Sequence, residues 1–290
     1  RRASFQRPSR TLLTDILSAL SLQADLRGLV HTFGQRCHFR SSYPHTRAAF
    51  LLDRGKSLLF TFLALDALRT VVRFFGPLGT PEGRSIFFPS LAPPAKYALS
   101  TALTLAIGSA IFSYISSLHS LVSLVCVGLQ GQSPALWPPL FDRPWRVHSL
   151  KDFWTRRWHQ LFRRPFVACS WAGRAVAGDS GAVLAAFLGS GLLHEAGMRC
   201  MSRGGTGWRT VGFFLAQGVG CLLEHAFESI SGREVLGLPG RVWAWGWLLL
   251  SGQALADCFA VRGTAGASLY PEWMSPCELV LNRVFGVYTR

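Results

Sequence analysis

The chain has 290 residues, of which 49% are hydrophobic and only 16% are charged, whereas ordinary soluble domains carry about 25% charged residues. Its 30 Lys and Arg against 15 Asp and Glu give a formal net charge of +15. So few acids in so apolar a chain disfavour an ordinary soluble enzyme. Two classes remain, a nucleic-acid-binding protein with a large core and a membrane protein with basic loops. Because the chain begins with Arg and not Met, we expect a fragment or a processed product.

Residues 1–56 are the first predicted part of the chain, a basic segment that lies on the membrane without crossing it. They contain ten Lys or Arg and three acids. His31, His38 and His45 recur every seven residues, but no apolar heptad accompanies them, so coincidence is preferred to a metal site. The seven Cys are widely spaced and include no C-x-x-C pair, which indicates neither a disulfide framework nor a zinc site.

Ser57 to Phe75 predicts the first membrane-crossing helix, because its apolar residues follow a helical period over a sufficient length. Asp66 and Arg69 are three residues apart, so they share a helix face and are positioned to pair. Charged groups at this depth have to face protein or water, not lipid. Residues 76–94 hold five Pro and three Gly and predict a loop.

The longest apolar stretch separates the two remaining classes of protein. Residues 97–141 contain no Asp, Glu, Lys or Arg, and a helix of about 20 apolar residues crosses the hydrocarbon core of a bilayer. The alternative is a buried central helix of a soluble protein, but a soluble core rarely leaves 45 consecutive residues without a surface charge. The sequence therefore predicts a membrane protein with a long helical stretch at 97–130, partnered by the lipid bilayer and not by nucleic acid.

Three shorter apolar runs follow, at residues 180–193, 210–223 and 242–256. They are long enough to cross a bilayer only if the ionisable residues at their ends, His194, Glu224 and Asp257, lie within the membrane. Residues 143–174 carry eight Lys or Arg and one acid, which predicts a cytosolic loop. Residues 57–290 are thus predicted to form one all-α, multi-pass transmembrane bundle.

Residues 149–166, SLKDFWTRRWHQLFRRPF, form the densest cationic and aromatic cluster of the chain. Ser149 and Asp152 resemble a capping box and predict the start of an α-helix. On that helix, Asp152 and Arg156 are four residues apart and positioned to pair. Two interpretations stay open. Trp and Arg anchor the helix at the membrane interface, or Arg binds phosphate groups while Trp stacks on an adenine ring.

His194 ends a run of small and apolar residues, in the motif SGLLHEAG at 190–197. An imidazole in apolar surroundings is suited to act as a general base near neutral pH. The alternative is a packed His whose ring bonds a backbone carbonyl. The motif lacks the second His of a zinc protease. Glu224 and His225 end the next apolar run, either as a partner of His194 or, as slightly favoured, as an interfacial pair.

These two motifs resemble the signatures of the wax synthase-like branch of the membrane-bound O-acyltransferase family. SLKDFWTRRWHQLFRR is similar to the family's Phe-Trp-x-Arg-Arg-Trp-His-Gln helix. FLGSGLLHEAG is similar to the small-residue helix that ends in the family's membrane-embedded His. WPPLFDRPWRVHSL before the first motif, LRGL at 26–29 and FFLAQGVGCLLEHAF after the second motif also resemble fungal members.

The resemblance implies a multi-helical membrane protein of the endoplasmic reticulum that transfers an acyl group from acyl-CoA to a hydroxyl without a metal. His194 matches the family's catalytic His. His159 stands where related sterol and diacylglycerol acyltransferases carry an Asn, so it is the second expected catalytic residue. The residues expected to bind acyl-CoA are Trp154, Arg156, Arg157, Trp158, Gln160, Arg163 and Arg164. Those expected to support the catalytic His are Ser190, Glu195 and Glu224.

Three functions stay open at this point. The first is wax ester synthase-like transfer from acyl-CoA to a lipophilic alcohol, in which His194 accepts the alcohol's proton and His159 or Gln160 stabilises the oxyanion. The second is transfer from acetyl-CoA to a terpenoid or other secondary-metabolite alcohol. The third is a non-catalytic membrane relic of the family.

Overall fold

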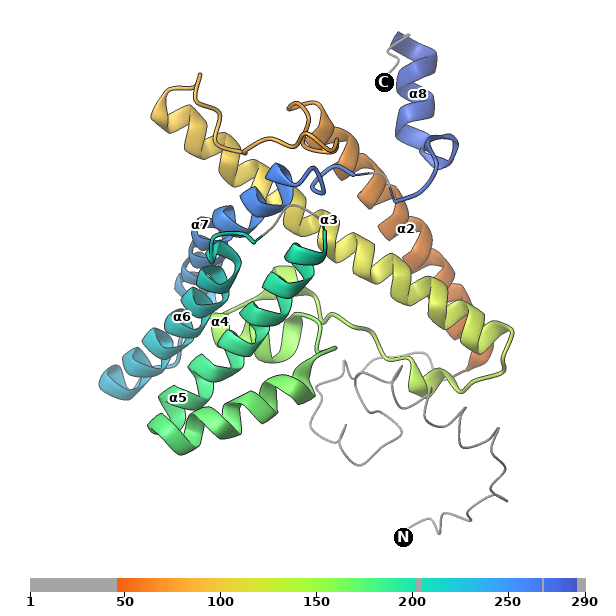
Figure 1. Cartoon of the computed structure of the whole chain (residues 1–290). Helices are drawn as coiled ribbons and strands as arrows, with labels where there is room; N and C mark the ends of the chain where they lie inside the picture. The colour runs from red at the N-terminus through yellow and green to blue at the C-terminus, as the bar shows by residue number, and fades with distance from the viewer. Residues whose placement is uncertain (1–45, 202–204, 268, 286–290) are drawn as a thin grey trace.

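The computed structural model describes residues 46–201, 205–267 and 269–285. Every regular element among these residues is a helix, and Figure 1 shows the long helices crossing one another without a sheet. The predicted all-α fold is confirmed. The predictions for His31, His38, His45 and the motif at 26–29 lie outside the described residues.

Three of the described helices are long and apolar enough to cross a membrane. They are α3 (Pro93–Gly128), α5 (Arg163–Cys200) and α6 (Arg209–Ser231). The helices α2 (Arg47–Arg73) and α7 (Gly237–Val261) are not among them, so the crossing helix predicted at Ser57 to Phe75 and the run at 242–256 do not meet this criterion. The described part of the chain therefore has the helical, multi-span character that its composition predicts.

Helix α2 begins ten residues before the predicted start at Ser57, because Thr46 caps it. The Thr46 hydroxyl accepts a hydrogen bond from the backbone N–H of Ala49, which satisfies one of the free N–H groups of the first turn. The proposed division between residues 1–56 and 57–290 falls inside this helix. The two-part organisation of the chain stays a prediction, since residues 1–45 are not described.

Helices α2 and α3 form the most extensive helix pair of the molecule (Figure 1). They run antiparallel, as three hydrogen bonds along their length show. Arg47 donates to the carbonyl of Gly128, Ser120 donates to Ser57, and the hydroxyls of Thr61 and Ser117 lie 2.8 Å apart. Small and hydroxyl side chains allow this close approach.

The burial pattern of α3 is inverted relative to a helix of a soluble protein. It buries Ser100, Ser113, Ser117, Ser120 and Ser123 against its neighbours. Many of its large apolar side chains are exposed, among them Leu105, Leu118, Leu121, Val122 and Val125, although Leu103, Ile107 and Val127 are buried. Helices that pack in lipid have small residues at their contacts and apolar side chains on the lipid face. This pattern supports the choice of a membrane class over a soluble core.

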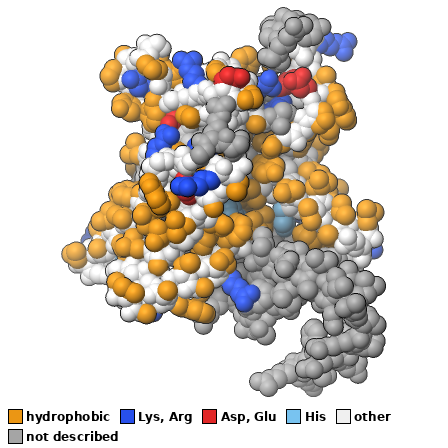
Figure 2. Space-filling view, in the orientation of Figure 1, with side chains coloured by type: hydrophobic (Ala, Val, Ile, Leu, Met, Phe, Trp, Pro, Cys, Tyr) orange, Lys and Arg blue, Asp and Glu red, His pale blue; other side chains and the backbone are white. Residues whose placement is uncertain are grey.

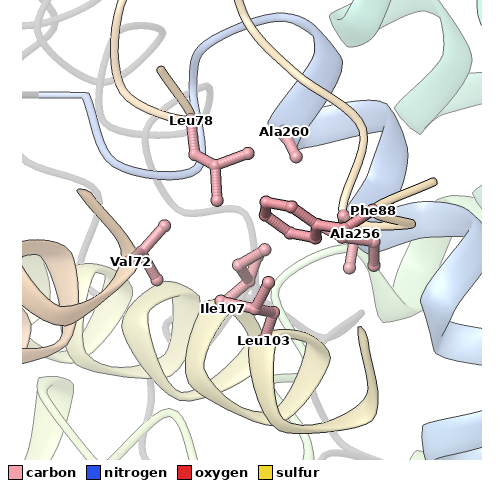
Figure 3. Close-up of a cluster of buried hydrophobic side chains, with 8 residues drawn as sticks. Val72, Leu78, Phe88, Leu103, Ile107, Ala256 and Ala260 are labelled. Carbon is pink, nitrogen blue, oxygen red and sulfur yellow. The ribbon is translucent and has the colours of Figure 1, made fainter. Parts of the chain in front are cut away.

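A buried apolar cluster joins α2, α3, α7 and the loop at residues 76–92. Figure 3 shows Leu78 and Phe88 from the loop meeting Val72, Leu103 and Ile107 of the first two helices. Helix α7 contributes Ala256 and Ala260. The loop predicted from Pro and Gly is therefore a loop in the structure, but an ordered one that closes this end of the helix bundle.

Helix α5 is a hairpin and not one straight span. The backbone leaves the helical conformation at Ala177 and Gly178, and Gly178 has a φ of +60°. A Cβ added to Gly189 would lie 2.7 Å from the sulfur of Cys169, although 20 residues of straight helix would separate these positions by about 30 Å. The chain therefore folds back at Gly178, and residues 163–176 pack along residues 179–200 (Figure 1). The predicted basic loop at 143–174 is helical from Arg163 onward.

The C-terminal segment packs on α2 through charged and hydroxyl groups. The predicted proximity of Asp66 and Arg69 is confirmed at 3.5 Å, and both side chains are buried. Asp66 also accepts hydrogen bonds from Tyr270 and Ser275, and Arg69 pairs with Glu278 of α8 (Pro276–Phe285) at 2.7 Å. These contacts attach α8 to the rest of the bundle.

The α-helix predicted from Ser149 onward is wrong beyond its first turn. Ser149 caps the short helix α4 (Leu150–Asp152), as expected. The chain then continues as the π-helical turn η4 (Phe153–Arg157), and Trp158 is extended. In a π-helix the facing residues are five apart and not four. Asp152 consequently pairs with Arg157, and the predicted pair with Arg156 is not formed.

Candidate active site

The two signature motifs meet at one apolar cavity of about 690 Å³. Its walls come from α3, the 3-10 turn η3 (Pro144–Arg146), η4 with the residues after it, and helices α5, α6 and α7. Within the described lining, the titratable side chains are His159, Arg163 and His194, in a wall made mainly of aromatic and aliphatic groups. In Figure 2, pale blue His surface lies recessed among orange hydrophobic side chains. A few polar groups converging in a large apolar pocket are typical of a ligand site.

His194 lies on the second arm of α5 and is oriented by its own helix. Its Nδ1 lies 2.8 Å from the backbone carbonyl of Ser190, one turn earlier. A carbonyl oxygen only accepts, so Nδ1 donates and the lone pair of the ring is on Nε2. The ring also packs on Phe214 of α6, with centroids 4.4 Å apart. His194 therefore bonds a carbonyl, as the packed-His alternative expects, and also lines the cavity, while its role as a base stays a prediction.

His159 lies just after the π-helical turn and is held among aromatic rings. Phe141 packs edge-on against it at 5.7 Å, and Trp158 and Phe162 lie within 6.5 Å. Its Nδ1 is buried with no hydrogen-bond partner among the described residues. Burial, and to a lesser degree the neighbouring His194, lower the pKa of His159 from 6.5 to about 4. The ring is therefore neutral near pH 7.

Trp154 and Trp158 face inward and line the cavity. Trp154 packs edge-on against Phe187 at 5.7 Å and lies 6.2 Å from Phe214. Trp158 stacks on Phe153 at 5.3 Å. The π-helical turn thus presents an aromatic wall to the cavity, which does not fit the interpretation of these two rings as membrane anchors.

The four Arg residues of the first motif differ in their surroundings. Arg163 lines the cavity, and its Nε is buried without a hydrogen-bond partner in the described part of the chain. Arg157 is engaged within its own segment, by Asp152 and by the carbonyls of Asp142 and Arg143. Arg156 and Arg164 are exposed and do not line the cavity. Arg163 is therefore the cation best placed to meet an anionic ligand.

Gln160 also lines the cavity but uses its amide within the motif. Its Nε2 donates to the carbonyl of Thr155, five residues earlier, at 2.9 Å. The side chain is buried. Gln160 thus holds the end of the π-helical turn that carries His159.

Glu224 supports the first motif and not His194. Its carboxylate accepts the backbone N–H groups of Leu150 at 2.6 Å and Lys151 at 2.9 Å, and the indole N–H of Trp243 at 2.9 Å. An acid at the N-terminus of a helix satisfies free N–H groups and interacts favourably with the helix dipole. Glu224 thereby attaches the start of α4 to α6 and α7. His225 is exposed, and the interpretation of Glu224 and His225 as an interfacial pair stays a prediction.

Ser190 and Glu195 act in different places. Ser190 reaches His194 through its backbone carbonyl. Glu195 is buried and accepts hydrogen bonds from the backbone and hydroxyl of Thr206, and it pairs with Arg199. It thus joins the end of α5 to the start of α6 and does not line the cavity.

The sequence alone identified only some of the residues that line the cavity, and it predicted no metal site among them. Phe112, Phe214, Trp145 and Trp245 line the cavity without having been predicted as site residues. Trp145 and Phe214 belong to stretches that resemble the family, whereas Phe112 and Trp245 have no signal beyond helical spacing from other apolar residues. No group of three or more His, Cys, Asp or Glu among the described residues is arranged to hold a metal ion.

Comparison with known proteins gives one family. The model described as "Membrane bound O-acyl transferase family" matches residues 137–216, which contain both motifs. The acetyltransferase atnC of Arthrinium is 25% identical over 250 residues, covering 78% of this chain and 56% of that protein. The acetyltransferase ataH of Aspergillus terreus is 28% identical over 270 residues, covering 81% and 86%. A long-chain-alcohol O-fatty-acyltransferase of Simmondsia chinensis is 35% identical over 133 residues, covering 39% and 37%.

The alignments cover 56% of the Arthrinium protein and 37% of the Simmondsia chinensis protein, but 86% of the Aspergillus terreus protein. No solved structure matches it significantly. The matched region nevertheless contains both histidines of the cavity and the π-helical turn between η3 and α5. The family match over residues 137–216 and the fatty-acyltransferase and acetyltransferase relatives show that the chain is similar to the membrane-bound O-acyltransferase family, and they support its wax synthase-like branch.

Proposed function

We propose that the chain transfers an acyl group from acyl-CoA to the hydroxyl of a lipophilic alcohol, within the cavity that both motifs line. The observation that carries the proposal is the pair of imidazole side chains, His159 and His194, in a cavity wall made mainly of apolar residues. Such a cavity admits a lipophilic alcohol and excludes bulk water, which would compete with it for the acyl group. Its volume of about 690 Å³ is in the range that buries one drug-sized ligand.

His194 is the proposed general base. Its Nδ1–H is held by the carbonyl of Ser190, so Nε2 is free to accept a proton. The alcohol oxygen forms a bond to the thioester carbonyl carbon while its proton passes to Nε2. The C–S bond then breaks, and the proton passes from His194 to the departing thiolate of CoA.

His159 is the proposed donor to the oxyanion. A neutral ring carries one N–H, and the burial of His159 keeps the ring neutral. A buried ring nitrogen without a partner in the described residues has a hydrogen bond to offer a substrate. Gln160 is a weaker candidate for stabilising the oxyanion, because its amide already donates a hydrogen bond to the carbonyl of Thr155.

Arg163 is the proposed contact for the phosphate groups of the donor, since its guanidinium borders the cavity with Nε unpartnered among the described residues. Arg156 and Arg164 add positive charge on the exposed surface nearby. The aromatic side chains Trp154 and Trp158 border the same space. The proposed surroundings are the bilayer of the endoplasmic reticulum, with the basic stretch at 143–174 facing the cytosol.

Acetyl transfer to a terpenoid or similar alcohol is the second candidate. Five acetyltransferases align with 64–81% of this chain and a sixth with 32%, whereas the fatty-acyltransferases of Simmondsia chinensis and Arabidopsis thaliana align with 39% and 50%. The broader alignment favours a short acyl donor and a bulky acceptor. The stronger local identity, 35%, favours a long-chain donor.

Microsomes that contain the expressed chain test both candidates. Acetyl-CoA and palmitoyl-CoA are each offered with hexadecanol and with a terpenoid alcohol, and ester formation is measured. Esters that depend on His194 support the proposal, and the donor that is used decides between the candidates. His225→Ala is the matched control, because His225 is exposed and outside the cavity.

Two outcomes contradict the proposal. Full ester formation by His194→Ala shows that His194 is not the base. No ester from any donor with a folded wild-type chain supports the non-catalytic interpretation instead.

A further inference from the structure

Helix α3 forms one long side of the cavity, and a glycine lies at the middle of that side. Thr104, Gly108, Phe112 and Ile115 all line the cavity. Their spacings of four, four and three residues place them on one face of the helix. Adjacent members of this row are separated by about one helical turn, roughly 5.4 Å.

The two ends of this row differ. Phe112 lies at the histidine end, because its ring packs on Phe141 at 4.7 Å and Phe141 packs on His159 at 5.7 Å. Thr104 lies at the opposite end, where a Cβ on Gly252 of α7 would be 3.3 Å from its methyl group.

That opposite end of the cavity is closed. Ile107 and Ala256 line it and also belong to the buried cluster shown in Figure 3. The cavity thus extends along α3 from the histidines to a wall of packed side chains, and Gly108 lies between the two ends.

Nothing in the local backbone requires glycine at position 108. Its φ is outside the left-handed region, and an added Cβ would meet no heavy atom within 4 Å. Glycine inside a helix is less favourable than alanine. What the missing side chain leaves is open space in the cavity, at the centre of its α3 wall.

We propose that Gly108 is the specificity-determining position of the cavity. It admits a hydrocarbon chain or ring system that reaches from the histidines to the closed end at Thr104 and Gly252. A larger side chain at 108 would shorten the usable cavity to its histidine end, next to Phe112. The inference rests on the proposed function for the identity of the ligand as a lipophilic alcohol or acyl chain, but the binding that it predicts does not require turnover.

Binding of alcohols of graded length to the full chain in nanodiscs tests the proposal. Butanol, octanol and hexadecanol are titrated, and quenching of Trp fluorescence reports binding beside Trp145, Trp154, Trp158 and Trp245 of the wall. Gly108→Leu is expected to weaken hexadecanol binding by at least about 10-fold and to change butanol binding by less than about threefold, since one methylene in an apolar pocket discriminates by about 10- to 200-fold. Gly108→Ala is expected to give an intermediate effect.

Gly212→Leu is the matched control. Gly212 is also inside a helix and also has open space at its Cβ, but it is exposed and outside the cavity. It is expected to bind all three alcohols as the wild type does. Retained butanol binding by Gly108→Leu shows that the variant is folded, and Gly108→Ala provides the comparison if the larger side chain prevents folding.

The same binding profile in Gly108→Leu, Gly108→Ala and wild type overturns the inference, whether or not esters form. If Gly108→Leu loses hexadecanol binding while the wild type forms no ester, the inference is supported and the proposed function is contradicted. Where esters form, the acyl or alcohol length that the wild type prefers is expected to shorten in Gly108→Leu.

Discussion

Nδ1 of His194 donates a hydrogen bond to the backbone carbonyl of Ser190, 2.8 Å away and one helical turn earlier. The contact holds the ring from its own helix, so the orientation of Nε2 depends on the backbone and not on another side chain. His194→Gln is expected to lower kcat/KM for ester formation by about 10²–10⁴-fold, the usual contribution of a general base.

Ser190→Ala is the companion variant. It keeps the carbonyl, so kcat/KM is expected to change by less than about threefold, a difference that separates backbone orientation from side-chain support. Equal losses in both variants would show that the hydroxyl of Ser190 takes part in the reaction.

The buried ring of His159 predicts a pH dependence of stability. Its pKa is about 4 in the folded chain and about 6.5 when unfolded. Above pH 6.5 the ring is neutral in both states and contributes no pH dependence. As the pH falls from 6.5 toward 4 the unfolded chain binds a proton that the folded chain does not, so stability is lost, by about 2–3 kcal/mol in all.

Thermal unfolding in detergent between pH 7 and pH 4 measures this loss. His159→Gln is expected to lose less stability over the same interval than the wild type. Parallel pH profiles for the two proteins would show that His159 is protonated as readily in the folded chain as in the unfolded one.

Replacing Glu224 on α6 is expected to disturb the first motif, which lies elsewhere in the sequence. Its carboxylate accepts three N–H groups, two of them at the start of α4. Glu224→Gln leaves part of this set without an acceptor, and an unsatisfied buried group costs about 1–3 kcal/mol. We expect a lower melting temperature and lower kcat/KM, because the turn that carries His159 is no longer fixed.

Glu228→Gln is the matched control for Glu224→Gln. It lies one turn later on α6, and its pair with Lys151 is long, at 3.6 Å, with the Lys side chain mostly exposed. Such surface pairs contribute little to stability. If both variants melt alike, the three contacts of Glu224 do not hold the motif in place.

The long apolar helices could be predicted because their length and composition depend on local sequence alone. Residues 97–141 lack strong charges, and α3 ends close to the predicted positions. The two catalytic candidates could also be found, since each belongs to a recognisable motif. Their approach across 35 residues of sequence could not be predicted, because it depends on the reversal at Gly178, one glycine among the 29 of the chain.

The π-helical turn is a second feature that local patterns do not reveal. Asp152 has Arg at both four and five residues ahead, so charge spacing allows either pair. Packing of Phe153, Trp154 and Trp158 against the cavity wall accompanies the wider turn. Tertiary contacts of this kind override the helical register that the capping residue starts.

The register of that turn predicts that Arg157 contributes to the free energy of unfolding and that the neighbouring Arg156 does not. Arg157 bonds Asp152 and approaches the carbonyls of Asp142 and Arg143, whereas Arg156 is exposed. Arg157→Ala is expected to lower the free energy of unfolding by about 1–3 kcal/mol, since it leaves partly buried acceptors unsatisfied. Arg156→Ala is expected to stay within about 0.5 kcal/mol of the wild type. Chemical denaturation in detergent measures both, and the reverse order would support a regular α-helix at this site.

Replacing a glycine at the contact between the two arms of α5 is expected to move the two motifs apart. Gly173 and Gly181 approach so closely that a Cβ on either would clash with the carbonyl oxygen of the other. Gly173→Val therefore has to push the arms apart, at a cost of about 1–3 kcal/mol for overpacking. The first arm follows His159 and the second carries His194, so ester formation is expected to fall together with the melting temperature. Gly197→Val, on the same helix with open space at its Cβ, is the control and is expected to keep both. If the two variants melt and react alike, the arms do not depend on close glycine contact, and the hairpin does not set the distance between the histidines.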